Sequence, residues 1–227
     1  MSPRPYRLGQ RQAAIDETRA RVIAAARTLL VSAEPGRFSI DAVAQHADVS
    51  RATVYYQFHS KLGLLEAVFD SLGASGGLAG QADAFGLPDP LAALDSYVAV
   101  FARFWGAERT LHRRLRALAA LDPDLETALS ARQEWRRHGI TVLVDRLTPQ
   151  PTPTAPQPAA TTPQPAATAL QSAGGAPQQV RSEVIDMIFT LTSFEVFDVL
   201  ASAQRTTDSA IPLMQHLARA AVALLPA

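Results

Sequence analysis

The sequence contains no cysteine and a single lysine, Lys61, among its 227 residues. The absence of cysteine excludes disulfide bonds, thiolate catalysis and zinc sites built from cysteine. No two of the five histidines lie three or four residues apart, so neither a metal site nor a cofactor is expected. No run of eighteen apolar residues occurs, and the N-terminus has no hydrophobic signal segment. We therefore expect a soluble, cytoplasmic protein without a membrane partner.

The net charge of zero hides an uneven distribution of charge along the chain. Residues 1–61 contain nine basic and five acidic residues, which gives a net charge of +4 and leaves −4 for the remainder. Phosphate contacts dominate the affinity of proteins for nucleic acid. A basic N-terminal segment followed by an acidic remainder is therefore typical of a two-part DNA-binding protein.

Residues 38–68 have the pattern of two short helices joined by a tight turn. Ser39 is placed to cap the first helix, and apolar residues then recur at helical spacing. Asp48 is a turn former that tolerates the left-handed conformation, and Ser50 is placed to cap the second helix. This order of elements predicts a helix-turn-helix, whose second helix enters the major groove of DNA.

The second of these helices carries side chains suited to base edges and phosphates. Arg51 suits guanine and Gln57 suits adenine, because each side chain can form two hydrogen bonds to that base. Small apolar groups can contact thymine methyl groups, and tyrosine hydroxyls or a lysine at a helix N-terminus can reach phosphates. With the two capping serines, the expected DNA-binding residues are Ser39, Ser50, Arg51, Ala52, Thr53, Tyr55, Tyr56, Gln57 and Lys61.

This segment resembles the DNA-binding domain of the TetR family of bacterial transcriptional regulators. In that family the recognition helix and its exit carry the pattern Thr-(Leu/Val)-Tyr-Tyr-x-Phe-x-x-Lys-x-x-Leu-Leu, which residues 53–65 match. Asp48 replaces the usual turn glycine of the family, which is a mild departure. Leu62 and Gly63 replace the acidic pair that commonly follows the lysine. This second departure is expected to loosen the start of the connecting helix.

The resemblance implies an all-α protein with two domains. We place the helix-turn-helix DNA-binding domain at residues 12–72 and an effector-binding and dimerisation domain at residues 73–227. The first helix is expected over residues 16–32, after a mobile arm at residues 1–14. Residues 148–179 hold eight of the sixteen prolines and no charge, so a disordered linker is expected there.

The second domain contains aromatic residues at helical spacing, a pattern compatible with a packed core or with a ligand pocket. By the resemblance, these helices surround the effector pocket of the family, and apolar cavities between helices suit small hydrophobic molecules. The candidate pocket residues are Phe101, Phe104, Trp105, Trp135, His138, Phe189, Phe194 and Phe197. The resemblance also implies a homodimer in which the last two helices, both widely apolar, pair with those of a second subunit.

The function that the resemblance implies is repression of transcription. The dimer is expected to bind a near-palindromic operator in double-stranded DNA and to be released by an unidentified small-molecule effector. The alternative is a DNA-binding activator or scaffold with no physiological small ligand. We expect neither catalytic residues nor enzymatic activity. Residues 73–77 match the Gly-x-Ser-x-Gly nucleophile elbow around Ser75, but a helix precedes them where the elbow requires a strand.

Overall fold

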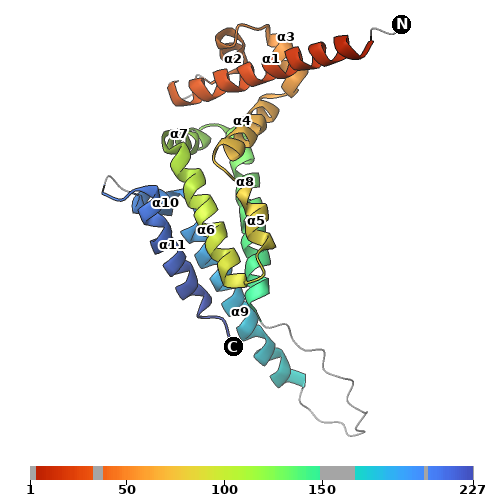
Figure 1. Cartoon of the computed structure of the whole chain (residues 1–227). Helices are drawn as coiled ribbons and strands as arrows, with labels where there is room; N and C mark the ends of the chain where they lie inside the picture. The colour runs from red at the N-terminus through yellow and green to blue at the C-terminus, as the bar shows by residue number, and fades with distance from the viewer. Residues whose placement is uncertain (1–3, 33–37, 149–166, 202–203, 227) are drawn as a thin grey trace. The chain divides into compact units, whose positions relative to one another are not determined.

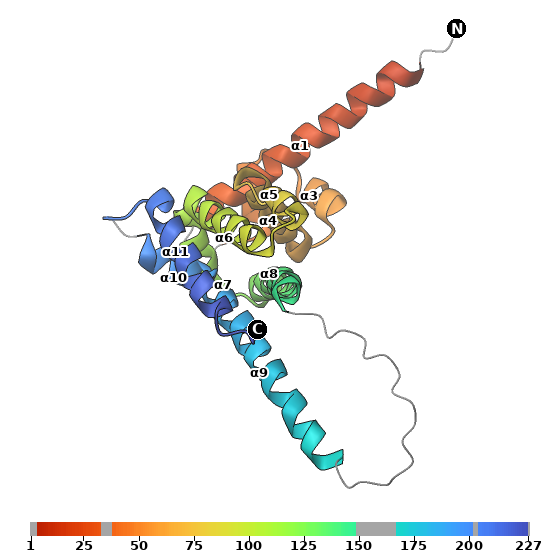
Figure 2. The ribbon, with the colours of Figure 1, turned by 60° about the horizontal axis from the view of Figure 1, so that its bottom comes forward.

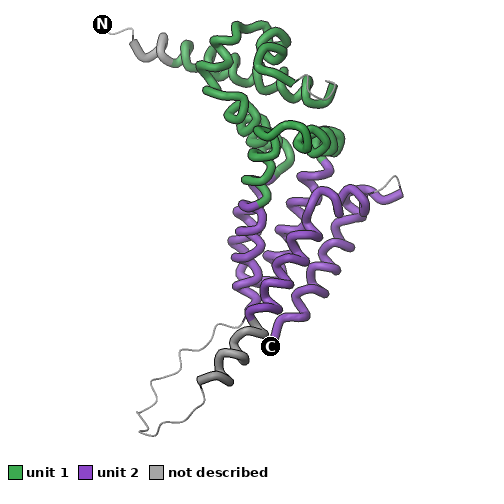
Figure 3. Tube along the Cα trace, turned by 180° about the vertical axis from the view of Figure 1, so that it is seen from behind, with its two compact units in different colours: residues 1–77, 107–133 green, residues 78–106, 134–227 purple. Residues whose placement is uncertain are grey.

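In the computed structural model, residues 4–32, 38–148, 167–201 and 204–226 are described, and within these ranges the chain forms eleven helices and no strand (Figure 1). The prediction of an all-α fold is confirmed. The chain forms two compact units, one of residues 1–77 and 107–133 and the other of residues 78–106 and 134–227 (Figure 3). The initial segment of the first unit ends at residue 77, whereas the boundary was predicted at residue 73. The unit also includes the later segment of residues 107–133. In the described ranges no helix is both long and apolar enough to cross a membrane.

The first unit contains the predicted helix-turn-helix. It comprises α1 (Arg4–Ser32), α2 (Ile40–His46), α3 (Arg51–Phe58), α4 (Lys61–Ser75), α7 (Arg109–Ala119) and the start of α8 (Pro123–Leu147). Helix α2 packs against α1 and α3, and α4 contacts α1 and α3 (Figure 1). Apolar side chains from these four helices form the core of the unit: Val22, Ala26, Leu30, Val43, Val54, Phe58, Leu64, Leu65 and Val68.

Helix α1 begins at Arg4, which corrects the expectation of an unstructured arm over residues 1–14. Residues 1–3 lie outside the described part of the chain. Pro5 falls in the first turn, where a backbone N–H has no helical partner, so the proline is compatible with the helix. Most residues from Leu8 to Ala14 are good helix formers, and they extend the helix well before the predicted start at residue 16.

The second unit consists of α5 (Gly80–Gly86), α6 (Pro90–Ala107), the rest of α8, α9 (Ala167–Leu191), α10 (Phe194–Leu200) and α11 (Thr207–Val222). Helices α10 and α11 both pack against α9 (Figures 1 and 2). Helix α9 begins at Ala167, which corrects the predicted linker over its C-terminal part. The alanines and glutamines there favour a helix, whereas Gly174, Gly175 and Pro177 disfavour it. The segment continues the packed helix after residue 180, so no new helix has to be nucleated. Residues 149–166, where the rest of the linker was expected, lie outside the described residues.

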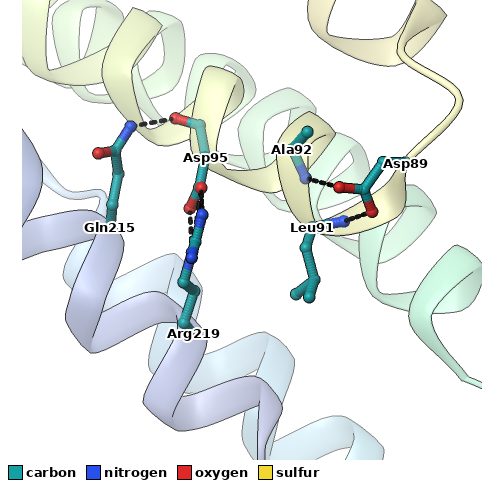
Figure 4. A network of polar contacts seen from close by, with 6 residues as sticks. All are labelled: Asp89, Leu91, Ala92, Asp95, Gln215 and Arg219. Carbon is teal, nitrogen blue, oxygen red and sulfur yellow. Dashed lines mark hydrogen bonds and ion pairs between the residues drawn. The ribbon is translucent and has the colours of Figure 1, made fainter.

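A polar network joins α6 to α11 (Figure 4). The Asp95 carboxylate on α6 accepts hydrogen bonds from Arg219 on α11, with Nε–Oδ distances of 3.0 and 3.1 Å. Gln215, one turn earlier on α11, donates from Nε2 to the Asp95 carbonyl oxygen at 3.1 Å. At the start of α6, the Asp89 carboxylate accepts from the backbone amides of Leu91 and Ala92, so it caps the helix.

Candidate functional site

The two helices of the predicted helix-turn-helix have the caps that the sequence predicts. Ser39 Oγ accepts from the Ala42 amide at 3.2 Å, and Ser50 Oγ accepts from the Thr53 amide at 3.0 Å. In the turn between the helices, Asp48 has φ 52°, the left-handed conformation that aspartate adopts at lower cost than most residues. The helix-turn-helix is therefore confirmed, with α3 as its second helix.

The exposed face of α3 consists of Arg51, Ala52, Tyr55 and Tyr56. The two tyrosines are 40% and 77% exposed, whereas Val54 on the opposite face is fully buried. Large aromatic side chains that stay exposed next to a positive charge provide stacking surface and hydroxyl donors for a partner. The short helix thus has one apolar face that anchors it and one polar, aromatic face that is open to solvent.

Arg51 is held in place on this face by two neighbours. Its Nη1 donates to both carboxylate oxygens of Asp41 at 3.0 and 3.1 Å, and its guanidinium lies 5.4 Å from the centre of the Tyr55 ring. The hydrogen bond from Arg51 to the Tyr55 hydroxyl, followed by the charge of Asp41, raises the pKa of Arg51 above its usual value. The ion pair is largely exposed, so it restrains the side chain only weakly.

Thr53 and Gln57, two other predicted DNA contacts, lie at the edge of the exposed face. Thr53 Oγ1 is 2.8 Å from Ser50 Oγ, and Gln57 Oε1 is buried without a hydrogen-bond partner in the described structure. Arg19 of α1 donates from Nη1 to the Gln57 carbonyl oxygen at 3.1 Å and lies over the Phe58 ring. Arg19 was not predicted to contact α3, because no local sequence pattern links α1 to the end of α3.

Lys61 lies at the N-terminus of α4, as predicted, but its ammonium group forms an ion pair with Asp122. Asp122 precedes α8 and also accepts from the backbone amides of Asp124 and Leu125. Both side chains of the pair are about three-quarters buried, and Lys61 Nζ is 6.0 Å from the centre of the Phe38 ring. A DNA phosphate that binds Lys61 must therefore compete with Asp122.

The turn between α3 and α4 and the first turn of α4 contain three residues whose structural roles were not predicted. His59 has φ 64°, and Ser60 Oγ caps α4 by accepting from the Gly63 amide at 2.9 Å. A Cβ atom on Gly63 would lie 2.2 Å from the Phe58 carbonyl oxygen. Gly63 was expected to loosen this helix start, but it instead permits the close approach of the first turn of α4 to the end of α3. A serine directly before the helix was the available signal.

Most of the predicted pocket aromatics form a packed core in the second unit. Phe104 and Trp105 have ring centroids 4.5 Å apart, and Trp105 Nε1 donates to the Thr192 carbonyl oxygen at 2.9 Å. The members of this aromatic core that are less than 10% exposed are Phe101, Phe104, Trp105, Phe194 and Phe197. For these residues, helical spacing marks packing positions, which is the more common meaning of such a pattern.

A buried arginine, which the sequence analysis also missed, lies beside this core. Arg136 is 2% exposed, and its Nη1 donates to the Phe189 carbonyl oxygen and to Thr192 Oγ1, both at 2.6 Å. Its guanidinium lies 4.0 Å from the centre of the Phe189 ring, another predicted pocket residue. The Tyr97 hydroxyl donates to the Arg136 carbonyl oxygen at 2.9 Å. Burial raises the pKa of the Tyr97 phenol, and the charge of Arg136 opposes this shift.

The other two predicted pocket residues, Trp135 and His138, do line a common pocket. It has a volume of about 240 Å³ and lies between α5 and α8 in the second unit. A larger apolar groove of about 670 Å³ runs between α9 and α11, lined by Asp186, Met187, Thr190, Leu191, Val196, Leu217, Ala220, Ala221 and Leu224. The pocket and the groove thus lie on different helix pairs of the same unit.

Ser75, the centre of the apparent nucleophile elbow, lies at the end of α4. Its Oγ is 3.3 Å from the Leu72 carbonyl oxygen and 3.3 Å from Glu108 Oε1. A helix therefore precedes this serine, as the sequence analysis expected, and not the strand of a nucleophile elbow. Among the described residues, no group of three histidine, aspartate or glutamate side chains is placed to hold a metal ion.

The capped helix pair with an exposed, basic and aromatic second helix defines a helix-turn-helix domain. Residues 22–68 match the model of the family described as bacterial regulatory proteins, tetR family. These residues therefore form a DNA-binding domain of the TetR type. No curated protein matches the chain.

Among solved structures, the chain is similar to a TetR-like transcriptional regulator from Rhodococcus sp. RHA1, with 19% identity, a TM-score of 0.59, and coverage of 91% of this chain and 96% of the other. A tetR-family regulator from Streptomyces coelicolor has 18% identity, a TM-score of 0.47 and coverage of 91% and 81%. RolR in complex with the ligand resorcinol has 18% identity, a TM-score of 0.44 and coverage of 95% and 98%. At 19% identity, the similarity to the Rhodococcus structure shows a shared fold and no shared function.

Proposed function

We propose that this protein is a transcriptional regulator of the TetR family, and that it is a repressor that binds a near-palindromic operator as a homodimer and leaves it when a small molecule binds the second unit. The observation that carries the proposal is the exposed face of α3. Arg51, Ala52, Tyr55 and Tyr56 combine a forked cation, a methyl group and two phenols on a helix whose opposite face is buried. These groups suit base edges and phosphates in the major groove.

The groove between α9 and α11 supports the homodimer. Its apolar lining includes Met187, Leu217 and Leu224, which are 43%, 42% and 55% exposed. Exposed apolar residues gathered on two adjacent helices mark an interaction surface, and a two-fold dimer joins such a surface to its own copy. A dimer presents two copies of α3 to half-sites one helical turn apart, about 34–36 Å.

Release by an effector follows from this geometry. Both recognition helices must meet their half-sites together, so a ligand that favours a different spacing of the helices lowers the affinity for the operator. The ligand must bind the conformation that does not fit the operator more tightly than the conformation that does. A ligand with equal affinity for both conformations would not shift the equilibrium between them. An activator or scaffold without a small ligand would keep the same DNA affinity in the presence of any such molecule.

The DNA-binding part of the proposal is tested by fluorescence anisotropy on DNA from the region upstream of the gene, against scrambled DNA, at two salt concentrations. We expect selective binding with a steep dependence on salt. Arg51→Ala should weaken binding by about 1–3 kcal/mol and relax the preference at one base pair. Arg205→Ala, which removes an exposed arginine of the second unit, is the matched control and should leave binding unchanged. If Arg51→Ala weakens binding to all DNA sequences equally, Arg51 contacts a phosphate and not a base.

The homodimer is tested by light scattering with Leu217→Glu, which places a charge in the groove between α9 and α11. We expect the mass to fall from that of a dimer to that of a monomer, because an unpaired buried charge is costly. Leu121→Glu changes a 70% exposed leucine outside the groove and should leave the dimer intact. A dimer that survives Leu217→Glu would place the interface elsewhere.

A further inference from the structure

The pocket between α5 and α8 is built from residues of one unit, and none of its lining residues belongs to the aromatic core. Gln81 and Phe85 of α5 line one side, and Trp135, His138, Gly139 and Val142 of α8 line the other. Its volume is about 240 Å³. A dry cavity of about 150 Å³ in another protein binds benzene, so this pocket has room for one ring with a small substituent.

The lining of the pocket is apolar and holds no carboxylate, guanidinium or ammonium group. A cationic ligand would lose its hydration there without gaining a counter-ion. The ionisable group of the lining is the His138 imidazole, which is exposed to solvent and offers an anion only a screened charge, so the lining favours uncharged molecules. Trp135 is 52% exposed, although its helix carries fully buried leucines and isoleucine elsewhere. A large aromatic wall open to solvent is the kind of surface that a planar ring covers favourably by stacking or by edge contact.

Gln81 is the buried polar side chain of this pocket, and the nitrogen of its amide is not satisfied by the protein. The side chain is 4% exposed, and Nε2 has no hydrogen-bond partner in the described structure. A buried donor without a partner costs stability, and such groups call for a specific explanation. Because the amide can turn by 180° about its last bond, it can present its donor to the pocket that it lines.

We propose that this pocket binds an uncharged, single-ring aromatic molecule that carries a hydrogen-bond acceptor. The Gln81 amide donates to the acceptor, and the ring lies against Trp135 and Phe85. The site itself stands on the pocket geometry, whereas its role as the effector site rests on the function proposed above. Trp135 and His138 were predicted pocket residues, but Gln81 and Phe85 carry no sequence signal that would separate them from core positions.

The binding site is tested by NMR with a matched pair of probes, acetophenone and ethylbenzene. The two molecules share the ring and the size of the substituent, but only acetophenone has an acceptor. The protein has two tryptophans, so Trp105→Phe assigns the indole signal of Trp135. We expect acetophenone to shift the signals of the Trp135 indole and the Gln81 side-chain amide saturably, with an affinity about fivefold higher than that of ethylbenzene.

Gln81→Met keeps the length of the side chain and removes the donor. We expect this variant to bind both probes equally, and to melt at or above the wild-type temperature because an unsatisfied buried group is gone. Gln178→Met, at an exposed position of α9, is the control and should keep the preference for acetophenone. Trp135→Ala removes an exposed side chain and so leaves the fold intact. We expect it to weaken the binding of both probes.

The proposal is overturned if the Trp135 signal does not move, if both probes bind the wild type equally, or if Gln81→Met keeps the preference. The role as effector site has its own readout, the anisotropy of operator DNA with and without acetophenone. If acetophenone binds to the pocket but does not release the DNA, the binding site is supported and its role as the effector site is rejected. Absence of selective DNA binding would overturn the proposed function and leave the NMR result on the pocket standing.

Discussion

Adjacent aromatic residues occur on α3 and on α6, and their environments are opposite. Tyr55 and Tyr56 on α3 are 40% and 77% exposed, whereas Phe104 and Trp105 on α6 are each 7% exposed. Helix α3 has eight residues, so its single apolar face suffices only to anchor it, while α6 is buried along most of its eighteen residues. The comparison teaches that aromatic residues at helical spacing indicate neither a binding surface nor a core until the surroundings of the helix are known.

The largest expected effect is a difference in protein stability between variants of these two aromatic groups. Phe101→Ala in the aromatic core of α6 should lower the free energy of unfolding by about 3–5 kcal/mol, because it leaves a cavity among packed rings. Tyr56→Ala should change the free energy of unfolding by about 0.5 kcal/mol or less and should weaken DNA binding instead. Urea unfolding and anisotropy measure the two quantities. A similar loss of stability in both variants would break the comparison.

The next effect concerns how tightly α3 is joined to α4. Gly63→Ala should destabilise the protein by about 1–3 kcal/mol, because the new Cβ atom would force the Phe58 carbonyl group to move. Gly9→Ala in α1 is the matched control, since open space surrounds its Cβ position, and it should stabilise the helix by about 0.5–1 kcal/mol. Thermal melting distinguishes the two. If Gly63→Ala leaves the melting temperature unchanged, the Phe58 carbonyl group can move away from the new Cβ atom without a cost in stability.

A buried tyrosine provides a third contrast with the exposed tyrosines of α3. The pKa of Tyr97 is raised in the folded state, so its contribution to stability is complete below the unfolded pKa of about 10 and is lost as the pH rises above it. The loss should reach about 1.4 kcal/mol per pH unit while the folded phenol stays protonated. Unfolding at pH 8 and pH 11 measures it. Tyr97→Phe should show a smaller decline, and an equal decline would assign the alkaline loss to other groups.

The smallest effect tests whether Asp122 competes with DNA for Lys61. Lys61→Ala should weaken binding to all sequences alike and reduce the salt slope by about one. Asp122→Asn should strengthen binding several-fold, because Asn keeps the cap on α8 while the charge that holds Lys61 is gone. A double-mutant cycle by anisotropy decides the point. If Asp122→Asn strengthens binding equally in the Lys61→Ala background, the ion pair has no part in DNA binding.

The helix-turn-helix could be predicted nearly residue by residue, since its determinants lie within a few residues of one another. Ser39 and Ser50 act through amides three residues away, and Asp48 adopts its conformation within a single turn. Such local rules need no knowledge of the rest of the chain. The same reasoning did not find the start of α1 or of α9, because helix ends depend on propensities that differ little between neighbouring residues.

The sequence by itself determined the helical class, the helix-turn-helix and its resemblance to the TetR family, because short-range caps and spacing are encoded in adjacent residues. Only the tertiary structure decided that Lys61 meets Asp122, that Arg136 is buried against Phe189, and that Gln81 shares a pocket with Trp135. Each of these pairs joins residues about fifty or more positions apart. Burial and partner choice at such separations follow from how whole helices pack, and no periodicity within one helix carries that information.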